Sequence, residues 1–257
     1  MGELDGKTVI VTGASKGIGA AIATAMVAAG ARVLAHYGGD RAGAKAAVAS
    51  AAPGQAVLLQ ADFSRRVEVD RFWEEALAAG DGRIDVLVNN AAIMRQAGGI
   101  PDPIEDWDRD WADSFAVNVD APARLMRHAV RHWLAAEAPG SVVGIGSWVT
   151  TRGTSHPGAI AYAASKAAIA AATKTVARNY AAKGILAYVI APGVVDTQMS
   201  VDSAARAGGV AAITAGLPMG EWVPPSDIAE VAVFLASGRA RHLTGATIDV
   251  NGAAYIR

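Results

Sequence analysis

Short apolar runs alternate along the chain with longer alanine-rich runs. The apolar runs cover residues 8–11, 32–35, 56–59, 86–88, 142–145, 186–190 and 247–250. They lack strict alternation of apolar and polar residues, which is typical of strands buried on both faces. Because a helical or loop segment follows each of the first six runs, we expect parallel crossovers between strands. The pattern predicts an α/β fold: a Rossmann-type doubly wound sheet, mainly parallel, of about seven strands with helices on both faces.

The domain organisation predicted from this pattern is simple. A doubly wound sheet of 257 residues can bury a full core, and no repeat or linker interrupts the chain, so we expect one domain over residues 1–257. The stretch 208–225 is rich in glycine and proline, but strand-forming sequence resumes after it. We therefore interpret residues 197–225, approximately, as a mobile flap over the substrate.

Composition and charge exclude several classes of function. With 23 basic and 24 acidic residues the net charge is −1, so no excess of positive charge favours nucleic acid or an anionic membrane. The absence of cysteine excludes disulfides, thiolate zinc sites and cysteine nucleophiles. Although 52% of the residues are hydrophobic, charge-free stretches such as 17–31 are too short to span a bilayer. The acidic start of the chain is unlike a secretion signal, and we expect a cytoplasmic protein.

A glycine-rich turn follows the first predicted strand. Residues 12–19 read TGASKGIG, and a helix is expected over residues 20–29. Glycines allow a tight turn close to a diphosphate, while a helix N-terminus offers free N–H groups to an anion. Such a cluster can also be a plain strand-to-helix turn. The expected cofactor contacts in this turn are Gly13, Ser15, Lys16, Gly17, Ile18 and Gly19.

Further motifs follow the turn in a fixed order. They are Asp62-Phe63, Asn89-Asn90-Ala91-Ala92, Asn118, Ser147, Tyr162-Ala163-Ala164-Ser165-Lys166 and Pro192-Gly193. With these motifs the chain resembles the short-chain dehydrogenase/reductase family, in particular its 3-oxoacyl-ACP reductase-like subgroup, from Thr12 to Gly252. Ala92 departs from the glycine usual in the family.

The resemblance implies an oxidoreductase that transfers a hydride between a nicotinamide cofactor and a ketone or secondary alcohol. It implies the catalytic residues Asn118, Ser147, Tyr162 and Lys166. It also implies contacts with three parts of the cofactor. Asp62 and Phe63 would lie at the adenine, and Asn90 and Ala91 at the adenosine ribose. The nicotinamide carboxamide would be contacted by Pro192, Gly193, Val195 and Thr197. Tyr162 and Lys166 complete the contacts, with the lysine on the nicotinamide ribose.

Tyr162 and Lys166 have a chemical reason to be paired. Their spacing of four residues places both on one face of a helix, one turn apart. A free phenol titrates near ~10, too high for proton exchange at neutral pH. We expect the adjacent ammonium, together with the positive ring of NADP⁺, to lower the pKa of Tyr162.

Ser147 and Asn118 are the remaining catalytic candidates. Ser147 follows the fifth predicted strand, where its hydroxyl could polarise the substrate oxygen. Its separation from Tyr162 is longer than is usual in the family, which implies an enlarged loop around residues 152–157 and leaves Thr150 as an alternative hydroxyl. For Asn118 the resemblance implies that it keeps a water in the proton relay; the alternative is a helix-interior asparagine bonded to the backbone.

The charge at the end of the second strand bears on the choice of cofactor. An NAD enzyme needs a carboxylate there to bind the ribose 2′-hydroxyl, and this position falls at Tyr37, before Gly38. Lys16 and Arg41 could instead pair with a 2′-phosphate, although Asp40 could reach the ribose. We expect Tyr37 and Gly38 to contact the cofactor, and NADP(H) to be preferred over NAD(H).

A metal site is not expected. His128 and His132 lie four residues apart on a helix expected over residues 121–136, but no third ligand is near in sequence. The acidic segment 102–113 could bind a cation, yet acidic residues are also favoured near a helix N-terminus. We interpret both features as non-metal surface features.

Two alternatives to a reductase of free ketones are open. One is a 3-oxoacyl-ACP reductase, although residues 135–139 (AAEAP) lack basic groups for an acidic carrier protein. The other is a non-catalytic NADP-binding regulator, which would be expected to lack Tyr162 or Lys166. A small-molecule substrate is expected in an apolar pocket and flap containing Trp148, Met199, Leu217, Met219 and Trp222, although these residues could equally belong to the core. The resemblance further implies a homotetramer, or a dimer, built through the long helices after the fourth and fifth strands.

Overall fold

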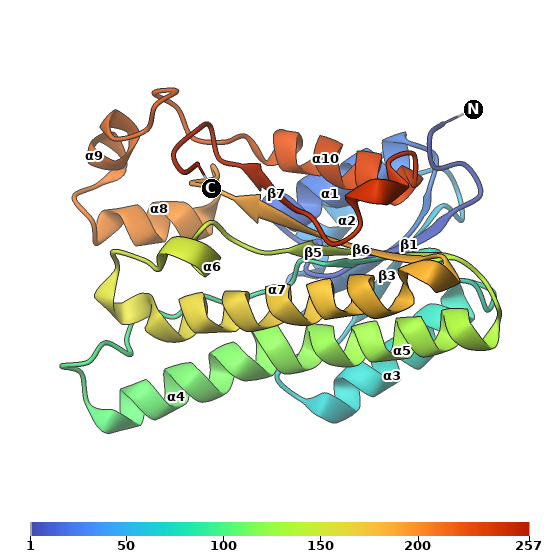
Figure 1. Cartoon of the computed structure of the whole chain (residues 1–257), viewed down its shortest axis with the longest axis horizontal. Helices are drawn as coiled ribbons and strands as arrows, with labels where there is room; N and C mark the ends of the chain where they lie inside the picture. Colours follow the sequence, from blue (N-terminus) through green and yellow to red (C-terminus); the bar gives the residue numbers. More distant parts are fainter. Residues whose placement is uncertain (1, 257) are drawn as a thin grey trace.

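A computed structural model describes residues 2–256 of the chain, as a sheet of seven strands covered by helices (Figure 1). The strands are β1 (Thr8–Val11), β2 (Arg32–Tyr37), β3 (Ala56–Gln60), β4 (Val86–Asn89), β5 (Gly140–Ile145), β6 (Ile185–Pro192) and β7 (Thr247–Val250). Their order is β3-β2-β1-β4-β5-β6-β7, and every pairing is parallel. The predicted doubly wound sheet is confirmed, and all seven apolar runs lie in strands. Residues 1 and 257 of the predicted domain lie outside the described residues.

Helices connect the strands. The α-helices are α1 (Gly17–Ala28), α2 (Arg41–Ala47), α3 (Arg66–Ala79), α4 (Ile104–Phe115), α5 (Ala121–Ala135), α6 (Val149–Arg152), α7 (Ile160–Tyr180), α8 (Gln198–Ala205), α9 (Val210–Ala215) and α10 (Pro225–Ser237). A π-helical segment, η1 (Ala116–Asp120), joins α4 to α5. Short 3₁₀ turns form η2 (Pro157–Ala159), η3 (Ala181–Lys183) and η4 (Arg241–Leu243). No helix within residues 2–256 combines the length and apolar character needed to cross a membrane.

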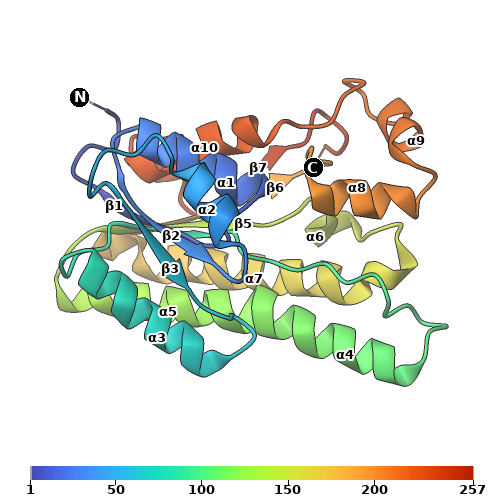
Figure 2. The same ribbon diagram turned by 180° about the vertical axis from the view of Figure 1, so that it is seen from behind.

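The helices form a layer on each face of the sheet. Helices α1 and α10 pack together on one face, and α3, α5 and α7 cover the other, as the two opposite views show (Figures 1 and 2). Along β1, Val9 and Val11 join the first core cluster while Ile10 joins the second. Burial of alternate residues in two cores explains why the strands are continuously apolar.

The sheet reverses direction beside its first strand. β1 pairs with β2 on one side and with β4 on the other, so the chain crosses over between β3 and β4. In open α/β sheets, ligands bind beyond the carboxyl ends of the strands at such a reversal. The topology therefore places the binding crevice next to the glycine-rich turn.

The expected flap is an excursion with helices of its own. A bridge between Val195 and Val223 closes its base, and α8 and α9 lie between these residues. Both helices stand at the end of the molecule that also carries α6 (Figure 1). The flap is therefore more ordered in secondary structure than its glycine and proline content indicates.

Candidate active site

One cavity of about 720 Å³ lies at the carboxyl ends of the strands. It is lined by many of the residues predicted for the site, from elements far apart in sequence. These are Gly13, Ser15, Lys16, Gly17, Ile18, Gly19, Gly38, Asp62, Phe63, Asn90, Ala91, Ser147, Tyr162, Lys166, Pro192, Gly193, Val195 and Thr197. Tyr37 and Asn118 do not line it. The structure thus brings the expected glycine turn and the expected reacting groups to one cavity.

The glycine turn is packed so closely that side chains would not fit. A Cβ on Gly19 would lie 2.1 Å from the Gly13 carbonyl oxygen. Gly13 has a φ of +68°, and a Cβ there would lie 2.9 Å from the Ala91 Cα. The Asn90 amide donates to the carbonyl oxygens of Thr12 (2.8 Å) and Gly13 (3.3 Å). Such a compact turn at the start of a 12-residue helix fits the diphosphate of a dinucleotide.

His36 is a cavity residue that sequence reasoning missed. Its Nδ1 accepts a hydrogen bond from the Gly13 N–H (3.0 Å), and its Nε2 lies 3.0 Å from the Ala61 carbonyl oxygen. The ring stacks on Phe63 with centroids 3.8 Å apart. Counting to the end of β2 selected Tyr37, but that side chain is buried away from the cavity. Side chains alternate along a strand, so positions 36 and 37 face opposite sides of the sheet, but the continuously apolar pattern of β2 does not indicate which of them faces the site.

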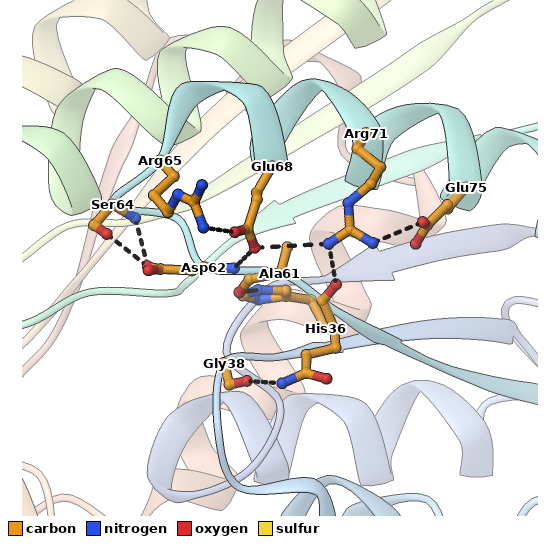
Figure 3. Close-up of polar contacts among 10 residues, drawn as sticks. His36, Gly38, Ala61, Asp62, Ser64, Arg65, Glu68, Arg71 and Glu75 are labelled. Carbon is orange, nitrogen blue, oxygen red and sulfur yellow. Dashed lines mark hydrogen bonds and ion pairs between the residues drawn. The ribbon is translucent and has the colours of Figure 1, made fainter.

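Asp62 lies at the rim of the same cavity, after β3 (Figure 3). Its Oδ1 accepts hydrogen bonds from the Ser64 hydroxyl (2.7 Å) and the Ser64 N–H (2.9 Å). These bonds, from the side chain first and the backbone second, lower the pKa of Asp62 below its ordinary value. The backbone N–H of Asp62 donates to Glu68 Oε2 at 2.7 Å. Asp62 is therefore held as a carboxylate in a fixed turn.

Ser147, Tyr162 and Lys166 come together at the other end of the cavity. The Lys166 ammonium donates to the Ile145 carbonyl oxygen (2.9 Å) and lies 5.9 Å from the centroid of the Tyr162 ring. Burial lowers the pKa of Lys166 to about 8. Burial also raises the pKa of Tyr162, and a hydrogen bond with Ser147 acts in the opposite direction. In the chain without a cofactor, desolvation is therefore the larger effect, and the expectation that the ammonium together with the positive ring of NADP⁺ lowers the phenol pKa stays a prediction.

Asn118 forms hydrogen bonds with segments of the chain that flank the reacting residues. In the π-helical segment η1, its Oδ1 accepts from the Ile93 N–H (2.8 Å). Its Nδ2 donates to the Ile93 carbonyl oxygen (2.9 Å) and to Ser165 Oγ (3.0 Å). The Ser165 hydroxyl in turn donates to the Tyr162 carbonyl oxygen at 2.7 Å. Asn118 thus connects the loop after β4 to the turn of α7 that carries Tyr162.

The segment between Ser147 and Tyr162 forms two short helices, α6 and η2. Ser147 lines the cavity, whereas Thr150 lies on α6 and does not. The geometry therefore favours Ser147 over the alternative hydroxyl.

The paired histidines on α5 contact neighbouring side chains of α3. His128 Nε2 lies 2.8 Å from Asp70 Oδ1, and Arg124 binds both oxygens of the same carboxylate. These contacts, with that of Arg124 the largest, hold the pKa of Asp70 well below its usual range. His132 meets the ring of Trp73. Within residues 2–256, no group of three or more His, Cys, Asp or Glu side chains is placed to hold a metal ion.

Comparisons with known proteins identify the family. Residues 13–253 match a family model described as enoyl-(acyl carrier protein) reductase. The chain belongs to the short-chain dehydrogenase/reductase family. It is 37% identical over 252 residues to 3beta-hydroxysteroid dehydrogenase 1 of Eggerthella lenta, covering 97% of this chain and 94% of that protein. It is 34% identical to the 3-oxoacyl-[acyl-carrier-protein] reductase FabG of Escherichia coli, covering 99% of both chains.

A solved structure is similar throughout. A dehydrogenase/reductase from Sinorhizobium meliloti superimposes with a TM-score of 0.85 at 33% identity, over 98% of this chain and 96% of that one. As a member of the short-chain dehydrogenase/reductase family, the protein is an oxidoreductase that acts on a carbonyl/alcohol pair with a nicotinamide cofactor.

Proposed function

We propose that this protein is an NADP(H)-dependent reductase of a small or medium ketone, or a dehydrogenase of the matching secondary alcohol. One observation carries the proposal: Ser147, Tyr162 and Lys166 line the same cavity as the glycine turn. A proton donor and a dinucleotide-binding turn in one cavity are what hydride transfer to a carbonyl requires.

The catalytic roles follow from the arrangement of the side chains. The nicotinamide, when bound, supplies or accepts the hydride. The Ser147 hydroxyl donates a hydrogen bond to the substrate oxygen, and the Tyr162 hydroxyl gives its proton to that oxygen in the reductive direction. Burial keeps the phenol of Tyr162 protonated. The site therefore already holds the proton that reduction of a carbonyl needs. Lys166 would hold the ribose of the nicotinamide, and Asn118 keeps the backbone near Tyr162 in place.

The preference for NADP(H) is part of the proposal. Lys16 lines the cavity beside Gly38 and Gly39, and Arg41 is the first residue of α2. Asp40, which could compete by binding a ribose hydroxyl, is the N-cap of α2 and accepts from the Gly43 N–H at 2.8 Å. A carboxylate used as a cap is less free to turn towards a ribose. The two cations then favour a 2′-phosphate.

The substrate end of the cavity is apolar. Ile93, Val117 and Met199 line it beside the reacting residues. Relatives named as a hydroxysteroid dehydrogenase and as a 3-oxoacyl-[acyl-carrier-protein] reductase support both a free ketone and an acyl-carrier substrate as candidates. We favour the free ketone, since residues 135–139 lack the basic groups that an acidic carrier protein would contact.

The test is a turnover assay with a panel of ketones, alcohols and a 3-oxoacyl thioester, following NADPH absorbance. Wild type is expected to turn over at least one ketone and to bind NADPH more tightly than NADH. Tyr162→Phe is expected to lower kcat by about 100- to 10,000-fold, with the Kd for NADPH unchanged, because only the proton donor is removed. Full activity of Tyr162→Phe would overturn the catalytic assignment, and equal dissociation constants would overturn the NADP(H) preference. Tight NADPH binding without any turnover would favour the regulatory alternative.

We also propose a homotetramer, or a dimer, built through α4, α5 and α7. On α4, Trp107, Trp111 and Phe115 form a ladder of ring contacts with centroids 5.6 and 5.3 Å apart. All three rings are half-buried. A partly exposed aromatic ladder on a long helix is typical of an interface rather than of a free surface.

A further inference from the structure

We propose that His36 is a positioning residue for the cofactor: its imidazole joins the glycine turn to β3 and sets the shape of the adenosine end of the cavity. The inference rests on the proposed function only in assuming that a dinucleotide binds in this cavity. His36 lies outside the sequence motifs that carry the family resemblance.

Several elements of the sheet meet at the side chain of His36. His36 lies on β2, near the carboxyl end of the strand. Its Nδ1 accepts from the N–H of Gly13, which follows β1, and its own carbonyl oxygen accepts from the Ala14 N–H (2.8 Å). Its Nε2 lies 3.0 Å from the carbonyl oxygen of Ala61, which follows β3 (Figure 3). Residue 36 therefore holds the start of the glycine turn through both its main chain and its side chain.

These contacts require one protonation state of the His36 ring. Because Nδ1 accepts a hydrogen bond from an N–H, it carries no proton, so Nε2 carries the proton and donates to Ala61. A protonated ring would place two N–H groups against each other at Gly13. The side chain is 3% exposed, between the face of Phe63 and the edge of Phe72, and burial lowers the pKa of His36 to about 4.

The charged groups near this cluster are engaged elsewhere (Figure 3). Arg65 donates to Glu68 at 2.8 Å, and Arg71 pairs with Glu75 at 2.9 Å and with Glu68 at 3.6 Å. Asp62 accepts from Ser64. Both ring hydrogen bonds of His36 are made with main-chain atoms. They therefore fix the conformation of the backbone at Gly13 and Ala61.

The consequence concerns the ligand. The Gly13 N–H points to His36, so the diphosphate must be bound by other N–H groups at the turn and at the start of α1. His36 and Phe63 both line the cavity, and their stacked rings form part of its wall. If the hydrogen bond to Gly13 is lost, the turn is free to move and cofactor affinity falls.

Two amide substitutions separate the two hydrogen bonds. In His36→Asn the side-chain oxygen can take the place of Nδ1 and accept from Gly13, whereas in His36→Gln the terminal amide can take the place of Nε2 and donate to Ala61. We expect His36→Asn to bind NADPH within about threefold of wild type. We expect His36→Gln to bind NADPH about tenfold more weakly, as the loss of one buried hydrogen bond implies. The kcat at saturating NADPH should be unchanged in both variants, because the reacting groups lie at the other end of the cavity.

The measurements are a fluorescence titration with NADPH, an unfolding midpoint for each variant, and the imidazole ¹⁵N spectrum of wild type at pH 6. The spectrum should show His36 neutral with the proton on Nε2, and this result does not depend on either variant folding. Equal NADPH affinities for the two variants, or a His36 that is charged or protonated on Nδ1, would overturn the proposal while leaving the proposed function intact. Failure of wild type to bind either NADPH or NADH would overturn both.

Discussion

Burial shifts the pKa of three ionisable side chains around the cavity in the direction that favours the neutral form. The pKa of Lys166 is lowered to about 8, that of His36 is lowered to about 4, and that of Tyr162 is raised. In each case desolvation is the largest cause, because a low-dielectric interior disfavours the charged form. The reacting phenol is thus prepared as a proton donor, and the histidine as a neutral linker between strands.

The lowered pKa of His36 predicts a pH dependence of stability. The unfolded chain binds a proton at residue 36 below about pH 6.5, whereas the folded chain does so only below about pH 4. The contribution to the free energy of unfolding is therefore fully present above pH 6.5 and is lost as the pH falls towards 4, by on the order of 3 kcal/mol in total.

Urea unfolding of wild type and His36→Asn at pH 7, 6 and 5 measures this contribution. The difference in free energy of unfolding between the two should shrink as the pH falls, while losses from carboxylates, such as Asp70, affect both proteins equally. A difference that stays constant over this range would contradict the prediction.

At the scale of elements, a π-helical segment interrupts the long helix formed by α4 and α5, beside the candidate active site. Helices α4 and α5 run on through the π-helical segment η1, and Asn118 lies within that segment. An inserted π turn changes the direction of side chains on a helix and is frequent at functional sites. Here it allows one amide to reach both the Ile93 backbone and Ser165.

Asn118→Ala is expected to reduce both stability and turnover. The substitution leaves the partly buried N–H and carbonyl groups of Ile93 without their partner, at a cost of about 1–3 kcal/mol in the free energy of unfolding. Ile93 lines the cavity, so a displaced loop should also lower kcat/KM. The matched control is Asn179→Ala on α7, whose amide makes one exposed bond to the Thr175 carbonyl oxygen. Equal unfolding midpoints for the two variants would show that the bonds of Asn118 have no structural role.

At the scale of the whole molecule, the aromatic ladder on α4 predicts assembly. Light scattering should give a mass that is a multiple of the 26.2 kDa chain, four times that mass for the tetramer. Trp107→Glu should shift the mass towards the monomer, because a charge in an apolar interface is costly. Val67→Glu on α3, where the side chain is 66% exposed, is the control and should leave the mass unchanged. A monomeric wild type would overturn the proposed assembly.

The sequence patterns predicted the fold of the protein but not every side chain in the candidate site. Counting along β2 led to Tyr37, yet His36 faces the cavity, since the pattern of a strand buried on both faces does not indicate which face carries the site. The relation of Asn118 to Ile93 and Ser165 depends on contacts 25 and 47 residues apart. Local spacing holds no information on such contacts.

By itself the sequence determined the strands, their parallel connection, the glycine turn and the spacing of Tyr162 and Lys166, because all of these depend on local periodicity and backbone conformation. Only the tertiary structure decided which strand ends meet at His36, where Asn118 directs its amide, and how deeply Tyr162 and Lys166 are buried. Protonation depends on solvent access, and access is set by segments that meet only when the chain is folded.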